Sequence, residues 1–547
     1  MRECLIRNKR ILFLFFLALF AFIVRIFRFN PEIGFISSDD AYVALASLDL
    51  FNITGTLDSV LIHGLRFFSF GWGYMRLLVT AVEVFIAQLF GLQVTEFTLV
   101  FPQIILGTTT CVLVYLLTEE LFDESTAKVS SILFAITPIA ITASRTIYNT
   151  ANTSIFILLL FLLTFIKYLK YDKHKLISPI FLGIYLSSDN QFISIFPLLV
   201  CLIYKYKHKL FKALPFRFFA IALLAYAPAI LPFLYFLIVK HRIDGGIIAH
   251  NLLRSKIIGF HPEIFTYLIY SLGLLLFILS AIAIIYCIWT RERKKNNVVI
   301  LIWASSYLLP WFFLITPALI GRPYFLPSVI PLIILSSQVI IGFFRAPLNK
   351  IVKISIFTII LFGIFNHTVY TTYKLDTRMP PTLFDSGSFG IKYFYGDYRT
   401  DNWGTKTAGY WIRNNTSENV TLFTDVGIPV AKYYFHRKVL ADPSIDYGVN
   451  ISTSLQKSEF LIKMKPEIDV VVLFEKSLIF FNNTALKGFE KIVEVTQDNV
   501  TKINIYKKST SANKTKIYKL DVQQYDRIFD NDYANTRSLK VDCYFCV

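Results

Sequence analysis

Long apolar runs separated by short charged loops dominate the first two thirds of the chain. Between residues 11 and 370 the sequence repeatedly forms stretches of about twenty apolar residues, the length of helix that crosses a hydrocarbon core of roughly 30 Å. Of the 547 residues, 55% are hydrophobic and 17% are charged, whereas a typical soluble domain carries about 25% charged residues. We therefore predict an α-helical polytopic membrane protein.

The apolar runs predict about eleven transmembrane helices. The first follows a basic amino terminus and has no small-x-small cleavage site after it, so we interpret it as an uncleaved helix rather than a signal peptide. The predicted spans are roughly 11–29, 94–117, 128–143, 154–169, 176–188, 191–204, 216–239, 263–290, 298–316, 324–343 and 351–370.

Positive charge marks one side of the predicted membrane domain. With the amino terminus in the cytoplasm, Lys and Arg concentrate in the alternate loops 167–175, 205–212, 291–295 and 345–353, which is the positive-inside pattern. The acidic loop 119–124 falls on the same side, and acidic residues contribute little to orientation. Topology thus explains the formal charge of +18, and we expect membrane lipids rather than nucleic acid as partners.

The composition changes after residue 370. A helix-like stretch at 405–414 is followed by β-branched runs at 420–424, 469–474 and 491–495, an alternation that favours a small α/β domain. We therefore divide the chain into a transmembrane catalytic domain, 1–370, with a first external loop at 30–93, and an extracytoplasmic α/β domain, 371–547.

Glycosylation sequons are dense in the carboxy-terminal part, which is consistent with an external face, although an Asn- and Thr-rich composition explains them equally well. They begin at Asn414, Asn415, Asn419, Asn450, Asn482, Asn499 and Asn513. Four of the six Cys lie in or beside apolar runs, so no disulfide framework follows. Cys543 and Cys546 have the spacing of half a zinc site, with no evident partner pair.

Two adjacent carboxylates, Asp39 and Asp40, follow the first predicted helix. Like charges side by side raise one pKa, and a carboxylate near an apolar boundary can act as a general base. The alternative is a helix cap, because Ser38 and Asp39 precede the helix-like stretch 41–50. The residues alone leave both interpretations open.

Cationic and aromatic residues gather in the predicted external loops. Arg66 lies in the first loop, Arg145 follows the third span, and Arg322 with Tyr324 opens the tenth span. Arginine is suited to binding a phosphate through several donors. For any one of these residues the alternative is snorkelling at the membrane interface, but Arg145 and Arg322 lie against the positive-inside bias and are the better candidates.

The order of these motifs resembles the large membrane glycosyltransferases of the GT-C fold. The chain is most similar to the protein O-mannosyltransferase and aminoarabinose transferase families, which use polyprenyl (dolichyl) phosphate sugars. The resemblance rests on the acidic pair after the first helix, the Arg after the third span and the segment Arg322-Pro323-Tyr324-Phe325-Leu326-Pro327. It extends to the tail, which opens with Gly409-Tyr410-Trp411-Ile412-Arg413-Asn414-Asn415.

The resemblance implies an inverting transfer of a sugar from a polyprenyl phosphate carrier to a protein or lipid-linked glycan acceptor on the external face. It makes Asp39 or Asp40 the base that deprotonates the acceptor hydroxyl. It makes Arg322, with Arg145 or Arg66, the group that stabilises the departing lipid phosphate, with a further hydrogen bond from Tyr324.

The chain also departs from the family pattern. Asp39-Asp40 stands where Asp-Glu is common, Asn149 stands near a position that is usually acidic, and the Lys-Pro-Pro segment of the first loop has no clear match. Some members use a divalent ion such as Mg²⁺ or Mn²⁺, which the two Asp could hold. Two carboxylates supply few of the oxygen ligands that such a cation needs, so no cofactor is assigned.

Three other functions remain as alternatives. Asp446-Tyr447-Gly448 matches the end of the oligosaccharyltransferase signature, but Pro443-Ser444-Ile445 precedes it in place of the expected tryptophans. A transporter would need ionisable residues deep inside its spans or paired broken helices, and the apolar runs are nearly free of charge. A structural or adhesive membrane protein is the third alternative.

Overall fold

The structure is a computed structural model that describes part of the chain at the level of individual residues. The described residues are 2–27, 44, 82, 84–86, 89–91, 96–145, 150–188, 194–206, 216–238, 263–289, 294–314, 326–347, 349–368, 404–425, 428–440, 461–475, 478, 481, 483–497, 500–509 and 517–521.

The chain forms two compact units. The first comprises residues 1–29, 55–82 and 100–394, and the second comprises 30–54, 83–99 and 395–547. The predicted domain boundary at 370/371 lies outside the described residues and stays a prediction.

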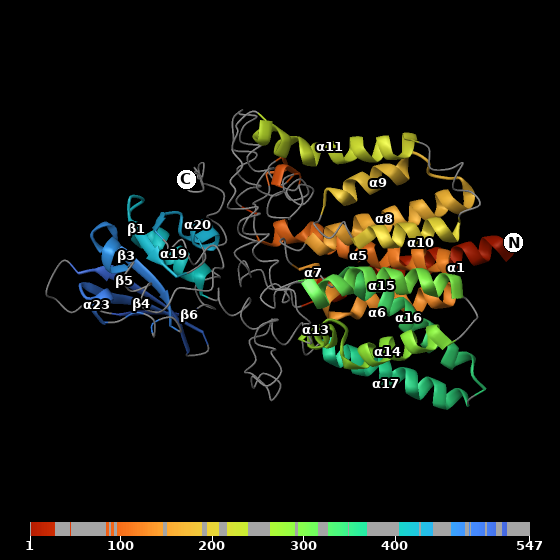
Figure 1. The fold of residues 1–547 in the computed structure, drawn as a ribbon. Coiled ribbons are helices and arrows are strands. Elements are labelled where there is room, and N and C mark those ends of the chain that lie inside the picture. The colour runs from red at the N-terminus through yellow and green to blue at the C-terminus, as the bar shows by residue number, and fades with distance from the viewer. Residues whose placement is uncertain are drawn as a thin grey trace. The chain divides into compact units, whose positions relative to one another are not determined.

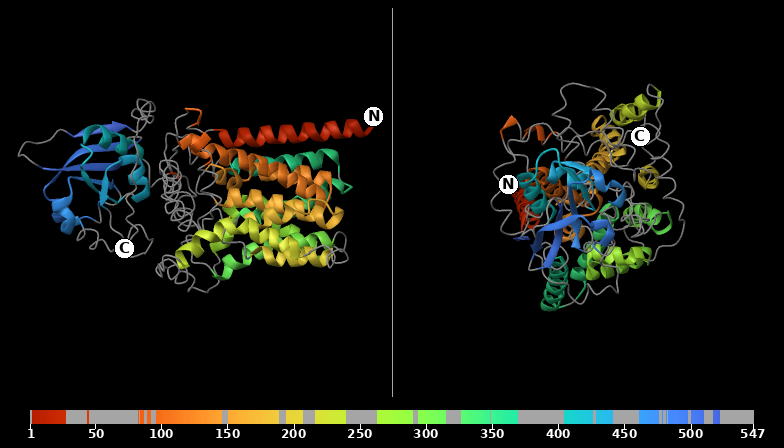
Figure 2. Two further views of the ribbon diagram at one scale, coloured as in Figure 1. Left: turned by 90° about the horizontal axis from the view of Figure 1, so that it is seen from above. Right: turned by 90° about the vertical axis from the view of Figure 1, so that its left-hand side faces the viewer.

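The described part of the first unit is a bundle of helices that run roughly along one direction (Figures 1 and 2). The helices are α1 (Arg2–Ile26), α5 (Glu96–Leu121), α6 (Glu124–Ile136), α7 (Pro138–Ala143), α8 (Thr150–Tyr171), α9 (Ile177–Leu186), α10 (Ile195–Lys205), α11 (Phe216–Ile238), α13 (Glu263–Leu272), α14 (Leu274–Trp289), α15 (Lys294–Leu314), α16 (Leu326–Arg345) and α17 (Lys350–Thr368).

Each predicted span coincides with one of these helices or with a pair of them. The predicted span 128–143 is broken into α6 and α7 at Pro138, which has no backbone N–H to donate and which disfavours a helical conformation at Thr137. Thr137 is extended, with φ −72° and ψ 130°. The predicted span 263–290 is broken into α13 and α14 at Gly273, whose φ of +85° is left-handed. The helices are thus found where the apolar runs predict them, with two interruptions that the run lengths do not show.

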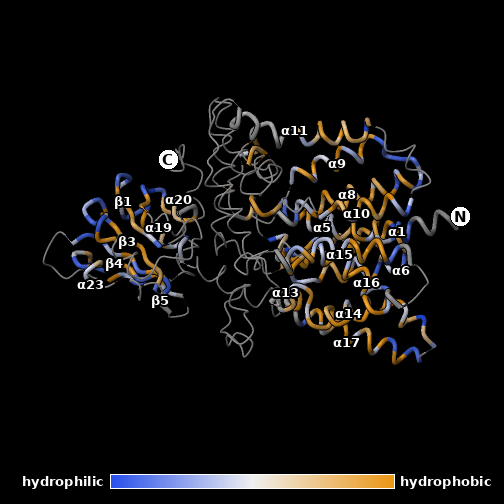
Figure 3. Tube along the Cα trace, viewed as in Figure 1, coloured by the Kyte–Doolittle hydropathy of each residue, from blue (hydrophilic) through white to orange (hydrophobic). Residues whose placement is uncertain are grey.

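Hydrophobic residues make up most of the length of the bundle's helices, and hydrophilic residues gather near helix ends (Figure 3). Among the described residues, Phe97–Leu121, Asn152–Tyr171 and Leu326–Arg345 are each long and apolar enough to cross a membrane, and several shorter apolar helices accompany them. The chain is therefore a membrane protein in its helical unit, while the number of about eleven spans stays a prediction.

One end of the bundle is held together by an acidic turn, residues 119–124. Arg10 of α1 pairs with Glu119 at 2.5 Å, and Lys170 of α8 pairs with Glu120 at 2.9 Å. Further partners come from three more helices: Arg345 of α16 lies 3.5 Å from Asp123, Lys128 of α6 pairs with Glu124, and Asn296 of α15 donates to the Leu121 carbonyl. The described helix ends at these contacts, which were predicted to share one side of the membrane, therefore lie at one end of the bundle. Which side that is stays a prediction.

The described part of the second unit from residue 404 onward is an α/β domain, as the sequence predicts. Its helices are α19 (Thr405–Asn415), α20 (Ile428–Phe435) and α23 (Asn483–Leu486), with a 3₁₀ turn at Lys465–Glu467. Its strands are β1 (Thr421–Thr424), β2 (Lys438–Leu440), β3 (Val470–Phe474), β4 (Phe489–Gln497), β5 (Val500–Lys508) and β6 (Tyr518–Asp521).

The six strands form one mixed sheet in the order β2-β1-β3-β5-β4-β6. β1 is parallel to both β2 and β3, whereas β5 is antiparallel to β3 and β4. Every residue of β1 and β3 is buried, as expected for central strands covered on both faces. Phe423, Val471 and Leu473 pack with Phe481 and Phe489 in the core of the sheet.

Candidate functional site

Of the six predicted site residues, Arg145 is the one that the structure describes. Asp39, Asp40 and Arg66 lie in the segments 28–43 and 45–81, and Arg322 and Tyr324 lie in 315–325, all outside the described residues. Their predicted roles therefore stay predictions.

The described helix ends that lead to these residues lie at the end of the bundle opposite the acidic turn. We call this end the far end. Arg10 marks the acidic-turn end of α1, and Arg25 lies 15 residues on, which is about 22 Å along the helix axis. α16 ends at the acidic turn with Arg345, so it begins at the far end with Leu326, two residues after Tyr324. The chain thus leaves α1 toward Asp39 and enters α16 from Tyr324 at the same end.

Arg145 is buried at the far end and binds the carboxy-terminal end of α1. It is 3% exposed, its Nε donates to the Arg25 carbonyl at 2.9 Å, and its Nη2 donates to the Phe27 carbonyl. The last carbonyls of a helix have no partner within the helix and carry partial negative charge, so a guanidinium stabilises them. Arg145 therefore joins α7 to the point at which the chain leaves α1.

Arg25 provides a second buried guanidinium, which the sequence did not predict as a site residue. It is fully buried, and its Nε donates to the Ser144 hydroxyl of the turn after α7 at 3.0 Å. Its Nη1 donates to the carbonyls of Ala21 at 3.0 Å and Ala135 of α6 at 3.5 Å. In the sequence, Arg25 has the position of an ordinary interfacial arginine at the end of a span, and no local signal shows that it turns inward.

Gly107 of α5 leaves space for the side chains of Arg25 and Ser144. A Cβ on Gly107 would lie 1.9 Å from Ser144 Oγ and 2.9 Å from Arg25 Nε, far inside contact distance. The thiol of Cys111, one turn further along α5, also contacts the Arg25 guanidinium. The two arginines thus occupy a site that four helices, α1, α5, α6 and α7, build together.

A neutral polar network lies beside it, between α5 and the start of α8. The Asn152 amide donates to the Gln103 carbonyl at 2.8 Å and to Gln103 Oε1 at 3.0 Å, and Gln103 Nε2 donates to Thr153 Oγ1 at 3.4 Å. All three side chains are buried. Polar groups inside a membrane domain are costly and commonly mark function, so the far end is the candidate site.

Acidic metal ligands do not gather in the described residues, where no three His, Cys, Asp or Glu side chains form a group that could hold a metal ion. The predicted acidic pair lies outside them, and its fit to a divalent cation is an expectation from the sequence alone.

Comparison with solved structures identifies the fold. The chain matches ArnT from Cupriavidus metallidurans bound to undecaprenyl phosphate, with a TM-score of 0.56 and 12% identity over 92% of this chain and 99% of that one. It also matches the oligosaccharyltransferase AglB from Archaeoglobus fulgidus in complex with an inhibitory peptide and a dolichol-phosphate, with a TM-score of 0.52, 14% identity, and 92% and 74% of the two chains covered. The chain therefore has the fold of the GT-C membrane glycosyltransferases, as its motifs predict.

The sequence itself matches one family. The profile of the dolichyl-phosphate-mannose-protein mannosyltransferase family aligns with residues 77–239, a segment that includes α5 to α11 and Arg145. A comparison with curated protein sequences finds no match. The resemblance to this family and to the aminoarabinose transferases is thus confirmed.

Proposed function

We propose that the chain is an integral membrane glycosyltransferase that moves a sugar from a polyprenyl phosphate carrier to an acceptor on the external face. The observation that carries the proposal is the pair of buried guanidinium groups, Arg25 and Arg145, at the end of α1 that leads to Asp39 and Asp40. The solved relatives ArnT and AglB were each captured with a polyprenyl phosphate, which supports such a lipid as donor. The match to the mannosyltransferase family supports sugar transfer as the reaction.

In the proposed reaction Asp39 or Asp40 removes the proton from the acceptor hydroxyl as its oxygen attacks the anomeric carbon. The bond between that carbon and the phosphate oxygen breaks, and the lipid phosphate leaves with inversion at the sugar. Arg322, with Arg145 or Arg66, stabilises the charge on the departing phosphate, and Tyr324 adds a hydrogen bond. Arg145 would act from the end of α1, where two of its nitrogens bind carbonyls.

Transfer of one sugar is favoured over transfer of a whole glycan. The match covers 99% of ArnT and 74% of AglB, and the fuller coverage of ArnT supports transfer of one sugar. The proposed acceptor is a protein or a lipid-linked glycan, and the set of donors in the assay identifies the sugar.

The test is sugar transfer by purified protein in liposomes from a set of synthetic polyprenyl-phosphate monosaccharides. We expect Asp39→Asn or Asp40→Asn, and Arg322→Ala, to reduce kcat by roughly 10² to 10⁴-fold. Arg345→Ala is the control at the other end of α16, where the side chain is exposed beside Asp123, and it should keep wild-type activity. Absence of transfer from every donor by folded wild-type protein would contradict the proposal and favour a transporter or a structural protein.

A further inference from the structure

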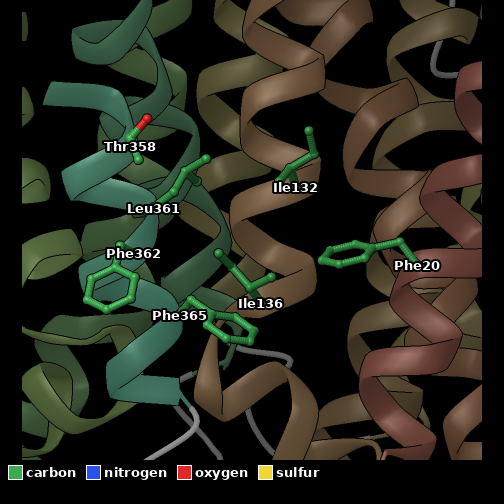
Figure 4. Close-up of a pocket in the computed structure, with 7 residues that line it drawn as sticks. All are labelled: Phe20, Ile132, Ile136, Thr358, Leu361, Phe362 and Phe365. Carbon is green, nitrogen blue, oxygen red and sulfur yellow. The ribbon is translucent and has the colours of Figure 1, made fainter. Parts of the chain in front are cut away.

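An apolar groove lies between α1, α6 and α17 of the helical unit (Figure 4). Its lining is apolar except for one threonine and consists of Phe20, Ile132, Ile136, Thr358, Leu361, Phe362 and Phe365. A lining of this kind suits the hydrocarbon chains that surround any membrane helix, and it selects no particular ligand. A more specific chemistry is found in the second unit, where the sequence contains glycosylation sequons.

Three of these sequons lie together in the described residues, at the end of α19 and in the turn before β1. They begin at Asn414, Asn415 and Asn419, and all three of these residues are exposed. The other four sequons of the tail begin outside the described residues. A glycan is bulky and needs a surface position, so exposure makes each of the three a candidate. Their hydrogen bonds differ, and this difference separates them.

The first two sequons belong to the carboxy-terminal end of α19. The side-chain amide of Asn415 donates to the Trp411 carbonyl at 2.9 Å, so the nitrogen that would receive a sugar already binds the helix. Thr416 completes the sequon of Asn414, and its hydroxyl donates to the Ile412 carbonyl at 2.6 Å. Both are local contacts that form with the last turn of the helix. Attaching a sugar at Asn415, or reaching Thr416 to modify Asn414, therefore competes with the helix end.

Asn419 lies beyond the helix, in a turn that presents its side chain outward. The Val420 N–H donates to the Ser417 carbonyl at 3.3 Å and closes the turn, with Asn419 exposed between them. Among the described residues no hydrogen bond holds its side-chain amide. The sequon Asn419-Val420-Thr421 also has the composition of a known acceptor, since the Archaeoglobus fulgidus oligosaccharyltransferase was solved with a tethered acceptor peptide containing Asn-Val-Thr.

Thr421, the last residue of this sequon, is fixed in the folded unit. It is 8% exposed, it opens β1 and it pairs in register with Lys438 of β2. Its N–H donates to Asp469 Oδ2 at 2.9 Å, and its carbonyl accepts from the Asp469 N–H at 3.0 Å. A transferase must recognise this threonine, because the sequon is defined by it. The folded sheet therefore shields part of the sequon, although it leaves Asn419 outside.

We propose that Asn419 is an N-glycosylation site and that the sugar is attached before β1 joins the sheet. The groups that hold Thr421 in the fold, β2 and Asp469, follow it in the chain, so the sequon is exported before its partners. Folding then buries Thr421 and leaves the glycan on the outside of the turn.

The donor in this step is a lipid-linked oligosaccharide. Its anomeric carbon forms a bond to Asn419 Nδ2, and the bond from that carbon to the lipid phosphate oxygen breaks. The amide nitrogen loses one proton to a base of the transferase, and the lipid phosphate leaves. The proposal does not depend on the proposed function of the chain, but it requires the second unit to lie on the external face.

Site-resolved mass spectrometry on the full-length chain tests the assignment. The chain is produced in a host that N-glycosylates exported proteins, with an Asn-Val-Thr tag after Val547 that reports the side of the membrane. Trypsin cleaves after Arg413 and Lys432, so the peptide 414–432 carries these three sequons and no other. Release of the glycan by an amidase in heavy-oxygen water converts the modified asparagine to labelled aspartate and so identifies it.

We expect the label at Asn419 in the wild-type protein. Asn419→Gln and Thr421→Val should each abolish modification of the peptide, whereas the matched controls Asn414→Gln and Asn415→Gln should keep it. Thr421→Val removes the hydroxyl and retains the branched side chain that suits a strand, so a loss of modification would not reflect misfolding.

The timing is tested on folded protein purified from a host without this pathway. The protein is incubated with the Archaeoglobus fulgidus oligosaccharyltransferase and its lipid-linked donor. We expect modification of the tag and not of the peptide 414–432, because Thr421 is then held by Asp469 and β2. Modification of Asn419 in the folded protein would contradict attachment before folding.

A label at Asn414 or Asn415 with Asn419 bare would overturn the assignment. A modified tag together with an unmodified peptide in cells would also overturn it, since the unit would then be external and the sequon unused. If neither were modified, the second unit would not meet the glycosylation machinery, and the proposal would fail together with the predicted orientation. None of these results depends on whether the chain itself transfers sugars, so the two proposals are tested apart.

Discussion

Replacing Gly107 by alanine inserts one methyl group into the contact between α5 and the Arg25–Ser144 hydrogen bond. The new Cβ would lie 1.9 Å from Ser144 Oγ, 2.8 Å from Ser144 Cβ and 2.9 Å from Arg25 Nε. None of these atoms is the far end of a flexible chain that can move aside cheaply, since Ser144 is held by the Ala140 carbonyl and Arg25 by three acceptors. The substitution must therefore both strain the packing of α5 against α7 and weaken the Arg25–Ser144 hydrogen bond.

The cost follows from three contributions. Overpacking a well-packed site costs about 1–3 kcal/mol. Loss of a hydrogen bond to a charged group costs about 1.5–3 kcal/mol. The gain in helix propensity from Gly to Ala returns about 1 kcal/mol. We expect Gly107→Ala to lower the free energy of unfolding of the helical unit by about 1.5–5 kcal/mol.

Gly342 of α16 provides the matched control. A Cβ there meets no atom within 4 Å, so Gly342→Ala should be neutral or stabilising by up to about 1 kcal/mol. The measurement is thermal unfolding of both variants in the same detergent, followed by sugar transfer at a temperature where both are folded. A Gly107→Ala variant that unfolds at the wild-type temperature would refute the reasoning, because the close approach of α5 to Arg25 would then not exist.

Three further predictions concern other parts of the chain. Gly183→Ala should also destabilise the helical unit relative to the same control, because its Cβ would meet a carbonyl oxygen of α11 at 2.2 Å, and thermal unfolding measures this. Burial, with the charge of Arg413, lowers the pKa of His436 to about 4. The second unit should therefore lose about 1–3 kcal/mol as pH falls from 7 toward 4, because the unfolded chain takes up that proton near pH 6.5. Hydrogen exchange in β2, corrected for its intrinsic pH dependence, should show this loss in the wild type and not in His436→Asn. Breaking the half-exposed pair of Arg10 with Glu119 by Arg10→Gln should cost about 0–1 kcal/mol, and high salt should reduce the difference in melting temperature between the variant and the wild type.

The helices could be predicted from the sequence because their signal is local. A run of apolar residues as long as a bilayer is thick leaves few alternatives, and the predicted span 324–343 differs from α16 by two residues at each end. The break at Pro138 could not be predicted with the same certainty, because Pro102, Pro310 and Pro331 lie inside helices that continue through them.

The buried cluster could not be predicted, because its contacts join residues far apart in the chain. Arg25 and Ser144 are separated by 119 positions, and nothing near either residue distinguishes a buried arginine from one that reaches the membrane surface. The second unit shows the same limit: the valine-rich run of β3 predicted a strand, whereas β2, with three residues, and the order of the sheet depend on pairings between distant segments.

The two ends of the helix bundle differ in how their cationic side chains are paired, and this difference bears on where an anion could bind. At the acidic turn Arg10, Lys170 and Arg345 each have a carboxylate partner and remain partly exposed, so these pairs fix the register of the helices at small energetic gain. At the far end Arg25 is fully buried with neutral acceptors and a free donor. An anion that bound there would gain a charge-assisted hydrogen bond without having to displace a carboxylate already paired with Arg25. The far end is therefore the end of the described bundle at which an anion would gain most from binding.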